Sequence, residues 1–385
     1  MNVRRHASIG FAVIAGAVLV SACGSTSTVA PATSAPSSSS ASASSSPTAM
    51  AVQTGNPAGP QTLSEAGSSL LYPYLQKLAP GINSAFANIT LTPAAGGSGT
   101  GQSEALSGTI DMGGSDAYLS AAQVSANPGA LNIPIAVSAQ AVNYNLAGFP
   151  NLKLSGTVLA QIYQGTIKVW NDPAIAALNT GATLPATPII PIRRSDSSGD
   201  TFIFTSFLSA TNPTWSSGPS FGTTVSWPTV ASELTAAGNP AMVDTLHSTP
   251  GGIAYVGISV EGAALVDGLG EAELENASGS YVQPDSTTIT AAVTAGATNV
   301  PASLAASLIY ETGAQAYPIV NFEYLIINPS KITSSDTALA IRTFIEWAIS
   351  PTGGATADNL SAVQFVPLPS NVIPLVNTAV AQITG

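Results

Sequence analysis

The stretch of this sequence best equipped for chemistry begins with two adjacent arginines. Arg193 and Arg194 are the only neighbouring basic residues beyond position 5, and they run directly into Asp-Ser-Ser-Gly-Asp at positions 196–200. A guanidinium is a planar fork of donors that fits two oxygens of a tetrahedral anion. Hydroxyls, glycine and the unpaired N–H groups of a helix start can complete such a site. The stretch indicates anion binding; a solvated surface pair is the alternative for the two arginines.

Other reactive side chains are scarce. His247 is the only histidine beyond His6, and Cys23 is the only cysteine in the chain. A Cys-His dyad or a zinc site made of His and Cys would need more of both, and a Ser-His-Asp triad would have to recruit His247. We therefore do not expect an enzyme, and we expect neither a metal nor a cofactor.

Three loops share one design, in which small residues and glycine lead directly into a helix. They are residues 66–70 before an expected helix at 71–78, residues 96–101 before 102–106, and residues 196–200 before a helix with Phe204, Phe207 and Leu208 on one face. A helix start carries a partial positive charge and free N–H groups, so each loop is a candidate anion cradle. Ordinary N-caps have the same composition. Three such loops in one chain favour anion binding.

The second loop also has the spacing of a nucleotide-binding P-loop. Gln102, however, stands where that motif requires lysine. Without this lysine the β- and γ-phosphates would lose their main cationic partner, so nucleotide hydrolysis is not expected.

The elements around these loops alternate between strand-like and helix-like segments. We expect strands at residues 133–144 and 188–192 and helices at 155–163 and 201–209. Such alternation predicts an α/β architecture with mainly parallel sheets flanked by helices. About 325 residues make up the body, a length that usually divides into two lobes.

The N-terminus, residues 1–22, is typical of an export signal. A basic start is followed by an apolar run from about Ile9 to Val20, well short of the roughly 20 residues that a membrane span needs. Positions 20–23, Val-Ser-Ala-Cys, resemble a bacterial lipobox. This implies lipidation of Cys23 and an extracytoplasmic protein anchored to the cell membrane; a plain signal peptide with an incidental cysteine is the alternative.

The next segment has the composition of a tether. Residues 24–59 are almost entirely Ser, Ala, Thr, Pro and Gly, so we expect residues 23–59 to be flexible and the folded body to begin near Pro60. Only seven Lys and Arg follow the signal, against 20 Asp and Glu. Nucleic acid would call for a basic face, so it is not an expected partner. The net acidity suggests adaptation to an acidic medium.

Several segments along the body form a recognisable series. They are residues 66–73 (Ala-Gly-Ser-Ser-Leu-Leu-Tyr-Pro), 97–99 (Gly-Ser-Gly), 110–117 (Ile-Asp-Met-Gly-Gly-Ser-Asp-Ala), 162–165 (Ile-Tyr-Gln-Gly) with 170–172 (Trp-Asn-Asp), 193–202 (Arg-Arg-Ser-Asp-Ser-Ser-Gly-Asp-Thr-Phe), 249–256 (Thr-Pro-Gly-Gly-Ile-Ala-Tyr-Val) and 317–319 (Tyr-Pro-Ile). In this order they closely resemble the phosphate-specific substrate-binding proteins of Pst-type ABC transporters, especially the actinobacterial lipoproteins. The resemblance runs from about Leu63 to Ile383.

The resemblance implies a two-lobed periplasmic-binding-protein fold of type II, with phosphate in the interlobe cleft. Lobe I would comprise residues 60–141 and 318–385, and lobe II residues 142–317, joined by hinges near 140–143 and 316–320. It implies an extracytoplasmic receptor, expected to be a monomer, that hands inorganic phosphate to the permease subunits of a membrane transporter.

The same resemblance implies the residues of the site. The phosphate-binding set is Ser69, Leu70, Ser98, Asp116, Arg194, Ser198, Gly199 and Asp200, with Asp196 supporting Arg194. Hydroxyls, backbone N–H groups and the guanidinium would donate to the ligand. Asp116 would accept the proton that phosphate keeps at neutral pH, whereas sulfate has none to give; an unpaired buried acceptor costs roughly 1–3 kcal/mol or more. The direction of the Asp200 side chain stays open, and an N-cap before residues 117–119 is the alternative for Asp116.

Three other functions remain in view. A receptor for sulfate, molybdate or a phosphonate would have the same general design, but one for ionised sulfate has no use for Asp116. A secreted phosphatase would need clusters of metal ligands. A surface adhesin or antigen without a ligand can be separated only by a binding assay.

Overall fold

The computed structural model describes residues 52–266 and 268–385. The expected signal peptide, the expected lipidated Cys23 and most of the expected tether therefore lie outside the described residues.

The described end of the expected tether is bound to the folded body. The Gly55 N–H donates to Thr343 Oγ1 over 2.9 Å, and the Asn88 N–H donates to Asn56 Oδ1 over 3.0 Å. These contacts begin a few residues before Pro60, and backbone and amide groups make them.

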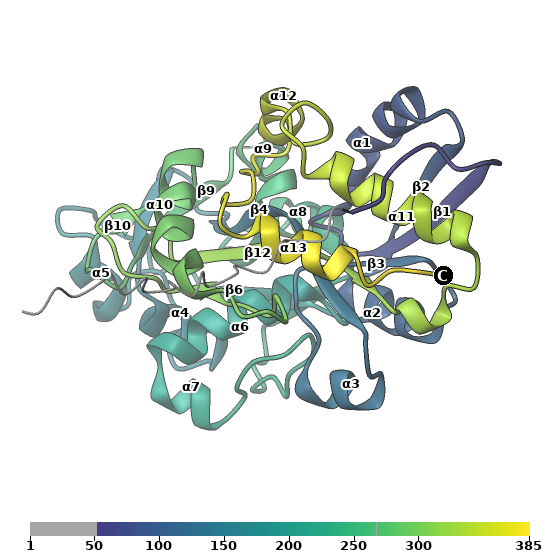
Figure 1. Cartoon of the computed structure of the whole chain (residues 1–385). Coiled ribbons are helices and arrows are strands. Elements are labelled where there is room, and N and C mark those ends of the chain that lie inside the picture. The colour runs from purple at the N-terminus through teal and green to yellow at the C-terminus, as the bar shows by residue number, and fades with distance from the viewer. Residues whose placement is uncertain (1–51, 267) are drawn as a thin grey trace, which may run out of the picture. The chain divides into compact units, whose positions relative to one another are not determined.

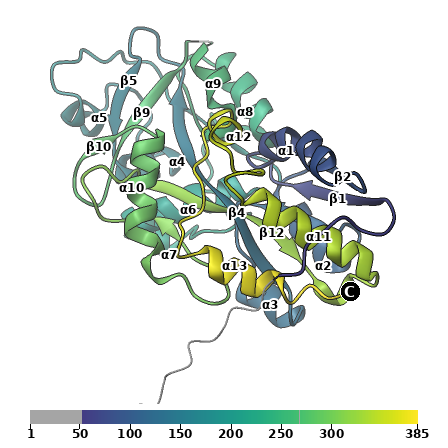
Figure 2. The same cartoon turned by 45° about the horizontal axis from the view of Figure 1, so that its top comes forward.

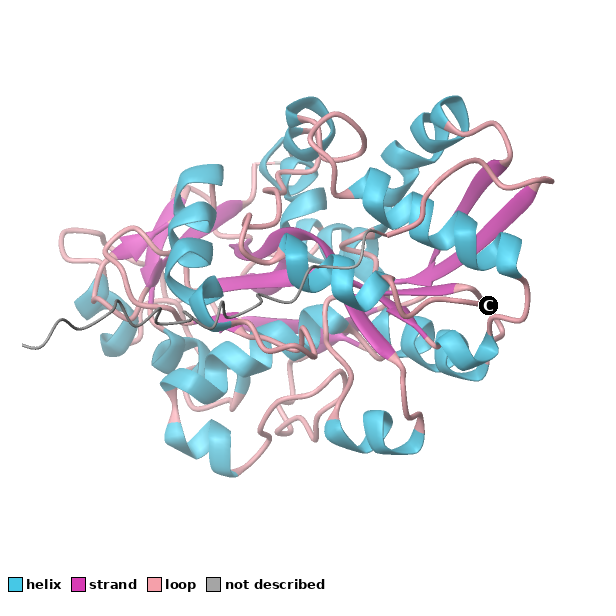
Figure 3. Ribbon diagram, viewed as in Figure 1, coloured by secondary structure: helices cyan, strands magenta, loops and turns pink. Residues whose placement is uncertain are grey.

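One mixed sheet runs through the body (Figures 1 and 3), in the hydrogen-bonded order β2-β1-β3-β12-β4-β8-β6-β7, with β5, β9, β10 and β11 branching from this path. The strands are β1 (Gln61–Gly67), β2 (Ile89–Ala95), β3 (Met112–Ser115), β4 (Leu131–Tyr144), β5 (Asn151–Leu154), β6 (Ile190–Arg194), β7 (Leu234–Ala236), β8 (Gly252–Gly257), β9 (Gly270–Glu275), β10 (Tyr281–Val282), β11 (Leu308–Ile309) and β12 (Ile319–Ile327).

Helices flank this sheet, and Figure 2 shows α1 and α11 beside strands β1 and β2. The α-helices are α1 (Tyr72–Ala85), α2 (Ser98–Ser107), α3 (Ala121–Ala126), α4 (Gly156–Tyr163), α5 (Pro173–Leu178), α6 (Gly199–Thr211), α7 (Pro213–Ser217), α8 (Gly238–His247), α9 (Ile258–Val266), α10 (Ser286–Gly296), α11 (Ser335–Ala348), α12 (Ala357–Ser361) and α13 (Ile373–Val380). Short 3-10 helices cover Ala297–Asn299 and Pro329–Lys331. In the part of the chain that the structure describes, no helix is both long and apolar enough to cross a membrane.

The long strand β4 joins the two ends of the sheet. Its residues 131–139 pair antiparallel with β12, and its residues 140–144 pair antiparallel with β8. Outside this centre the β1/β2, β1/β3, β6/β8 and β6/β7 ladders are parallel. The α/β prediction is confirmed, and the expected parallel pairing holds for the outer ladders but not for the central strands.

The predicted elements around the three loops are present with shifted ends. The strand expected at 133–144 is β4, and the helices expected at 71–78 and 102–106 are the longer α1 and α2. The helix expected after position 200 starts at Gly199, where the Thr201 N–H donates to the Ser198 hydroxyl. Each helix therefore begins inside its predicted loop or directly after it, so the first N–H groups of the helix lie next to the residues of that loop.

Candidate functional site

The three loops meet at one point. A Cβ atom added to Gly199 would lie 2.4 Å from both Asp116 Oδ2 and Ser98 Oγ, so the start of α6 lies against the start of α2. The Gly99 N–H donates to the Ser197 carbonyl over 3.0 Å. The first loop is joined to this group through Ser68, whose hydroxyl donates to Asp116 Oδ1. Three helix N-termini thus converge around the buried Asp116 side chain.

Arg194 is held between two carboxylates at this point. Its side chain is 1% exposed; Nε donates to Asp196 Oδ1 over 2.7 Å and Nη2 to Asp196 Oδ2, while Nη1 donates to Asp200 Oδ2 over 2.5 Å. Burial disfavours the charge of Arg194, but the Asp196 hydrogen bond and the attraction of Asp200 and Asp196 outweigh it and raise its pKa. The guanidinium is therefore a fixed cation in a predominantly acidic setting.

Asp200 points at Arg194, which answers the orientation that the sequence left open. Its carboxylate also accepts from Asn239 Nδ2 over 2.9 Å and from Gln140 Nε2 over 3.1 Å. Burial raises its pKa, and the attraction of Arg194 opposes that shift. Asp196 is less buried; burial would raise its pKa, but the hydrogen bond and charge of Arg194 lower it below the usual value.

The serine side of the site contains one residue that sequence reasoning missed. Besides donating to Asp116, the Ser68 hydroxyl accepts the N–H groups of Leu70 and Leu71, each over 3.0 Å. The Leu70 N–H, assigned to the ligand by resemblance, therefore has an internal partner here. The adjacent Ser69 hydroxyl accepts from the backbone N–H of Asn239 over 3.1 Å and from its Nδ2 over 3.2 Å. Its own hydrogen remains to be donated.

Asp116 lies between two hydroxyl donors. Its Oδ2 accepts from Ser98 Oγ over 3.3 Å, and the Asp116 backbone N–H donates to Ser98 Oγ over 3.2 Å. The N-cap alternative for Asp116 is wrong, because the next helix, α3, begins at Ala121 and is capped by Ser120. Burial, followed by the charges of Glu323 and Asp200, raises the pKa of Asp116 well above its usual range.

Glu323 is the second group that sequence reasoning missed. It lies on β12, is 0% exposed, and accepts from Ser138 Oγ over 2.5 Å and from Asn321 Nδ2 over 3.1 Å. Asn321 Nδ2 also donates to the Asp116 carbonyl over 3.3 Å. A single acidic residue inside the apolar run of residues 319–327 was the available signal.

Arg193 does not join the site. Its Nη2 pairs with Glu233 Oε1 over 2.8 Å, and its guanidinium lies 5.6 Å from the centre of the Trp227 ring. Because successive strand residues point to opposite faces, only one member of the arginine pair could face the helix starts.

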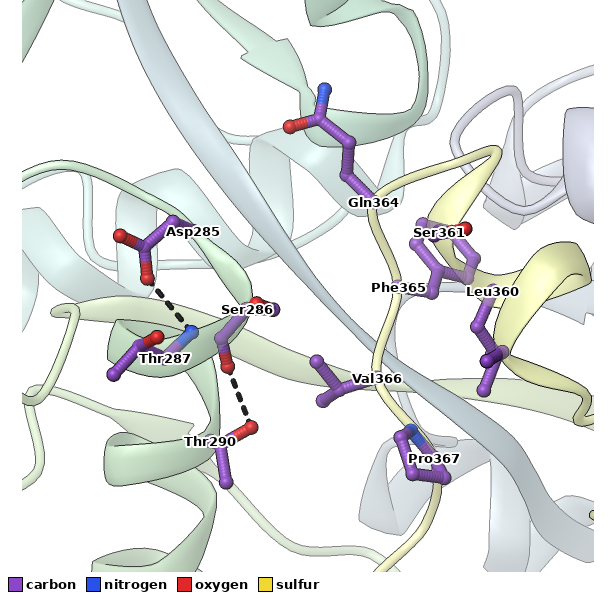
Figure 4. Close-up of a pocket in the computed structure, with 11 residues that line it drawn as sticks. Asp285, Ser286, Thr287, Thr290, Leu360, Ser361, Gln364, Phe365, Val366 and Pro367 are labelled. Atoms are coloured by element: carbon purple, nitrogen blue, oxygen red, sulfur yellow. Dashed lines mark hydrogen bonds between the residues drawn. The ribbon is translucent and has the colours of Figure 1, made fainter.

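Two further observations concern other parts of the described structure. Among residues 52–266 and 268–385, no group of three or more His, Cys, Asp or Glu side chains could hold a metal ion. A cavity of about 630 Å³ lies between the start of α10 and residues 357–367 (Figure 4). Its one charged side chain is Asp285, which accepts the N–H groups of Thr287 and Thr288. This cavity offers no cation to an anion.

Known proteins resemble this chain over most of its length. A family model described as a PBP superfamily domain matches residues 32–352. The phosphate-binding protein PstS of Methanocaldococcus jannaschii is 33% identical over 352 residues, which are 86% of this chain and 89% of that protein. The phosphate-binding protein PstS 3 of Mycobacterium leprae is 31% identical over 381 residues, which are 97% of each chain.

A solved structure supports the fold. The high-affinity periplasmic phosphate-binding protein PfluDING, bound with phosphate, matches with a TM-score of 0.65 and 22% identity over 81% of this chain and 91% of that one. Together with the sequence relatives, this means that the chain belongs to the PBP superfamily and, within it, to the PstS family of phosphate-binding proteins.

Proposed function

We propose that this chain is an extracytoplasmic receptor that captures inorganic phosphate and delivers it to the permease of an ABC transporter. The observation that carries the proposal is the convergence of three helix N-termini, the buried Arg194 fork and the buried Asp116 carboxyl group on one point. The PstS relatives of M. jannaschii and M. leprae are named as phosphate-binding proteins, which supports the same ligand.

The proposed ligand contacts follow from which donors have hydrogens to offer. The Ser69 hydroxyl accepts two hydrogen bonds and can donate one, while the Ser198 hydroxyl has only long bonds of 3.4 and 3.5 Å. The Gly199 and Asp200 N–H groups open α6 and have no acceptor within their own helix. Arg194 adds its charge. Leu70 would have to share its N–H between Ser68 and the ligand.

Asp116 is the proposed selectivity element. Hydrogen phosphate can donate a proton to a carboxylate, whereas sulfate would place acceptor oxygens against it. The cost of such a buried mismatch, roughly 1–3 kcal/mol or more, corresponds to a preference of about fivefold to 150-fold or more. Other oxyanion receptors remain the alternative function that a titration would reveal.

We further propose that two lobes close over the ligand, with lobe I formed by residues 60–141 and 318–385 and lobe II by 142–317. Contacts join these two sets of residues: the Gly99 N–H donates to the Ser197 carbonyl, and Ser259 Oγ donates to the Leu70 carbonyl over 2.7 Å. The hinge is proposed where β4 changes partner, near Gln140, whose carbonyl accepts from Tyr317 Oη over 2.8 Å.

The finer cellular features belong to the same proposal. An export signal at residues 1–22 and a lipid on Cys23 would anchor a monomer to the outer face of the membrane, where it acts as a receptor and not as an enzyme. The lipobox-like sequence at positions 20–23 supports the anchor. Labelling of cells with a fatty-acid analogue should modify wild type and not Cys23→Ser, and labelling of both would contradict lipidation at this residue.

Calorimetric titration of the mature chain, stripped of bound ligand by partial unfolding, tests the central function. We expect one-to-one phosphate binding and no heat with sulfate at neutral pH. Silence with phosphate and a signal with sulfate or molybdate would replace phosphate by another oxyanion.

A further inference from the structure

Glu323 lies next to Asp116 in the proposed anion site, and the proposed function assigns it no role. Its Oε1 accepts from Ser138 on β4 and from Asn321 on β12. Its Oε2 is buried and receives no hydrogen bond from an N–H or hydroxyl donor among the described residues. One donor is therefore missing at a carboxyl group that is fully enclosed by protein.

A proton shared with the Asp116 carboxyl group can fill this gap. The side chains of Glu323 and Asp116 are within hydrogen-bonding reach of each other. Asn321 holds the two residues together, because its Nδ2 donates to Glu323 Oε1 and to the Asp116 carbonyl. Ionised carboxylates can only accept hydrogen bonds. A bond between the two groups therefore requires one proton on the pair, which we call the site pair.

The charged surroundings of the site pair also favour a proton. The charged residue that faces the pair is Asp200 on α6, and Asp200 is paired with Arg194, which also binds Asp196. The other neighbours of the pair are neutral: Ser68, Ser98, Ser138, Asn321 and Tyr324. This region therefore contains four carboxyl groups and one guanidinium, that of Arg194. Burial raises the pKa of Glu323 to about 7; hydrogen bonds with Ser138, Asp116 and Asn321 oppose this rise, and the charge of Asp200 adds to it. A bound anion would add further negative charge.

We propose that Glu323 is the proton-holding partner of Asp116: with phosphate bound, neutral Glu323 donates its O–H to Asp116, which stays ionised toward the ligand. Solvent supplies the proton wherever the ligand-free site pair has lost it. This inference rests on the proposed phosphate function and makes Glu323 a positioning residue, since it acts on the ligand through Asp116.

A specific pH dependence follows. Where the site pair already holds its proton, phosphate affinity is full. As the pH rises past the loss of that proton, each binding event must recruit one, and affinity falls by up to about tenfold per pH unit. Phosphate itself titrates, but it does so equally for every variant and cancels when variants are compared.

The test is calorimetric titration of the ligand-stripped mature chain with inorganic phosphate, between about pH 6 and pH 8.5, in buffers of different ionisation enthalpy. Glu323→Gln retains an N–H donor for Asp116 and cannot titrate. Near pH 6 we expect its phosphate affinity to be within about threefold of that of wild type. Toward pH 8.5 we expect its affinity to fall by about tenfold less than that of wild type. Its proton uptake should fall toward that of phosphate alone.

Glu261 on α9 and Glu271 on β9 provide the matched control. They form a second buried pair of carboxyl groups, each of which affects the pKa of the other, and we call them the remote pair. Glu261→Gln removes one acid from that pair, as Glu323→Gln does from the site pair. It should keep the wild-type pH profile and proton uptake.

The outcomes separate the inference from the function. If Glu323→Gln binds phosphate with the same proton uptake and the same pH dependence of affinity as wild type, the inference is wrong and the proposed function stands. If Glu323→Gln does not fold, wild type decides: uptake near pH 8 in excess of phosphate's own protonation supports the shared proton, and no excess overturns it. Failure of wild type to bind phosphate at every pH overturns the proposed function as well.

Discussion

The site pair and the remote pair are both buried pairs of carboxyl groups, but they differ in their neighbours. In each pair burial raises the pKa of both acids, and each acid also affects the pKa of its partner. The site pair receives donors from Ser68, Ser98, Ser138 and Asn321 and lies beside the start of α6. The remote pair interacts with Asn143, and Oε1 of each glutamate lacks a donor among the described residues.

The difference lies in what each pair can exchange its proton with. The site pair faces helix N-termini and a guanidinium that attract an anion, so its protonation can be linked to a ligand. The remote pair is formed by residues of α9 and β9, and its hydrogen-bonding neighbour is Asn143 rather than a helix N-terminus or a guanidinium. We therefore expect its protonation to be linked to folding rather than to a ligand. Identical chemistry is therefore expected to give selectivity at one place and pH-dependent stability at the other.

The largest predicted effect is the loss of the cation beside the site pair. Arg194→Ala should weaken phosphate binding by at least about 100-fold, because two charge-assisted hydrogen bonds of about 1.5–3 kcal/mol each are lost and Asp196 and Asp200 lose the cation that pairs with them. Calorimetric titration measures the loss. Arg194→Lys, which keeps charge but not the fork, should fall in between, and affinity unchanged in both variants would remove Arg194 from the site.

Asp116→Asn should change selectivity more than affinity. An amide can donate to an acceptor oxygen, so sulfate no longer meets an unpaired carboxylate, and the ratio of phosphate to sulfate affinity should fall by about tenfold or more. Competition titrations with both anions measure the ratio. The same selectivity in wild type and variant would contradict the role of Asp116.

The remote pair should appear in the pH dependence of folding. Burial, and then its partner Glu271, raise the pKa of Glu261 to about 10. A raised acid pKa contributes stability that is complete below the unfolded pKa and lost as the pH rises through the folded one. Wild type should therefore gain stability on acidification from about pH 8 to pH 5, by up to about 1.4 kcal/mol per pH unit for each retained proton.

Chemical unfolding of wild type and Glu261→Gln over that range isolates the contribution of the remote pair. The variant should have a shallower slope by about one proton, while its phosphate affinity stays unchanged. Parallel slopes would mean that the remote pair holds no proton beyond those of the unfolded chain.

Arg193→Ala should have the smallest effect and serves as the neighbour control for Arg194. Arg193 binds Glu233 and lies against Trp227, with its side chain 22% exposed. Partly exposed ion pairs contribute about 0–1 kcal/mol, so we expect a slightly lower melting temperature and phosphate affinity within about twofold. An affinity loss comparable to that of Arg194→Ala would mean that charge, and not the fork, decides binding.

The sequence predicted the local parts of the site better than the distant ones. Glycine-rich helix starts are local, and the loops at 66–70, 96–101 and 196–200 do begin α1, α2 and α6. Which serine is left available to a ligand depends on backbone geometry: Ser68 accepts the N–H groups of Leu70 and Leu71, whereas Ser69 accepts from Asn239. Composition could not distinguish these neighbours.

Apart from Ser68, the groups that were missed come from far along the chain. Asn321 lies 205 positions after Asp116, and strand pairing between β12 and β3 brings that region of the chain to the site. The central strands were also expected to be parallel, since alternation of strands and helices says nothing of the crossing strands. Glu323 within an apolar strand was a visible anomaly, but its partner is set only by the sheet order.

A crystal structure of the protein grown with phosphate tests the account most directly. We predict one tetrahedral ion within hydrogen-bonding distance of Arg194, Ser69, Ser198 and Asp116, with the Asp200 and Asp196 carboxylates still beside the guanidinium. Phosphate bound elsewhere, or a site that stays filled by protein side chains at saturating phosphate, would contradict it.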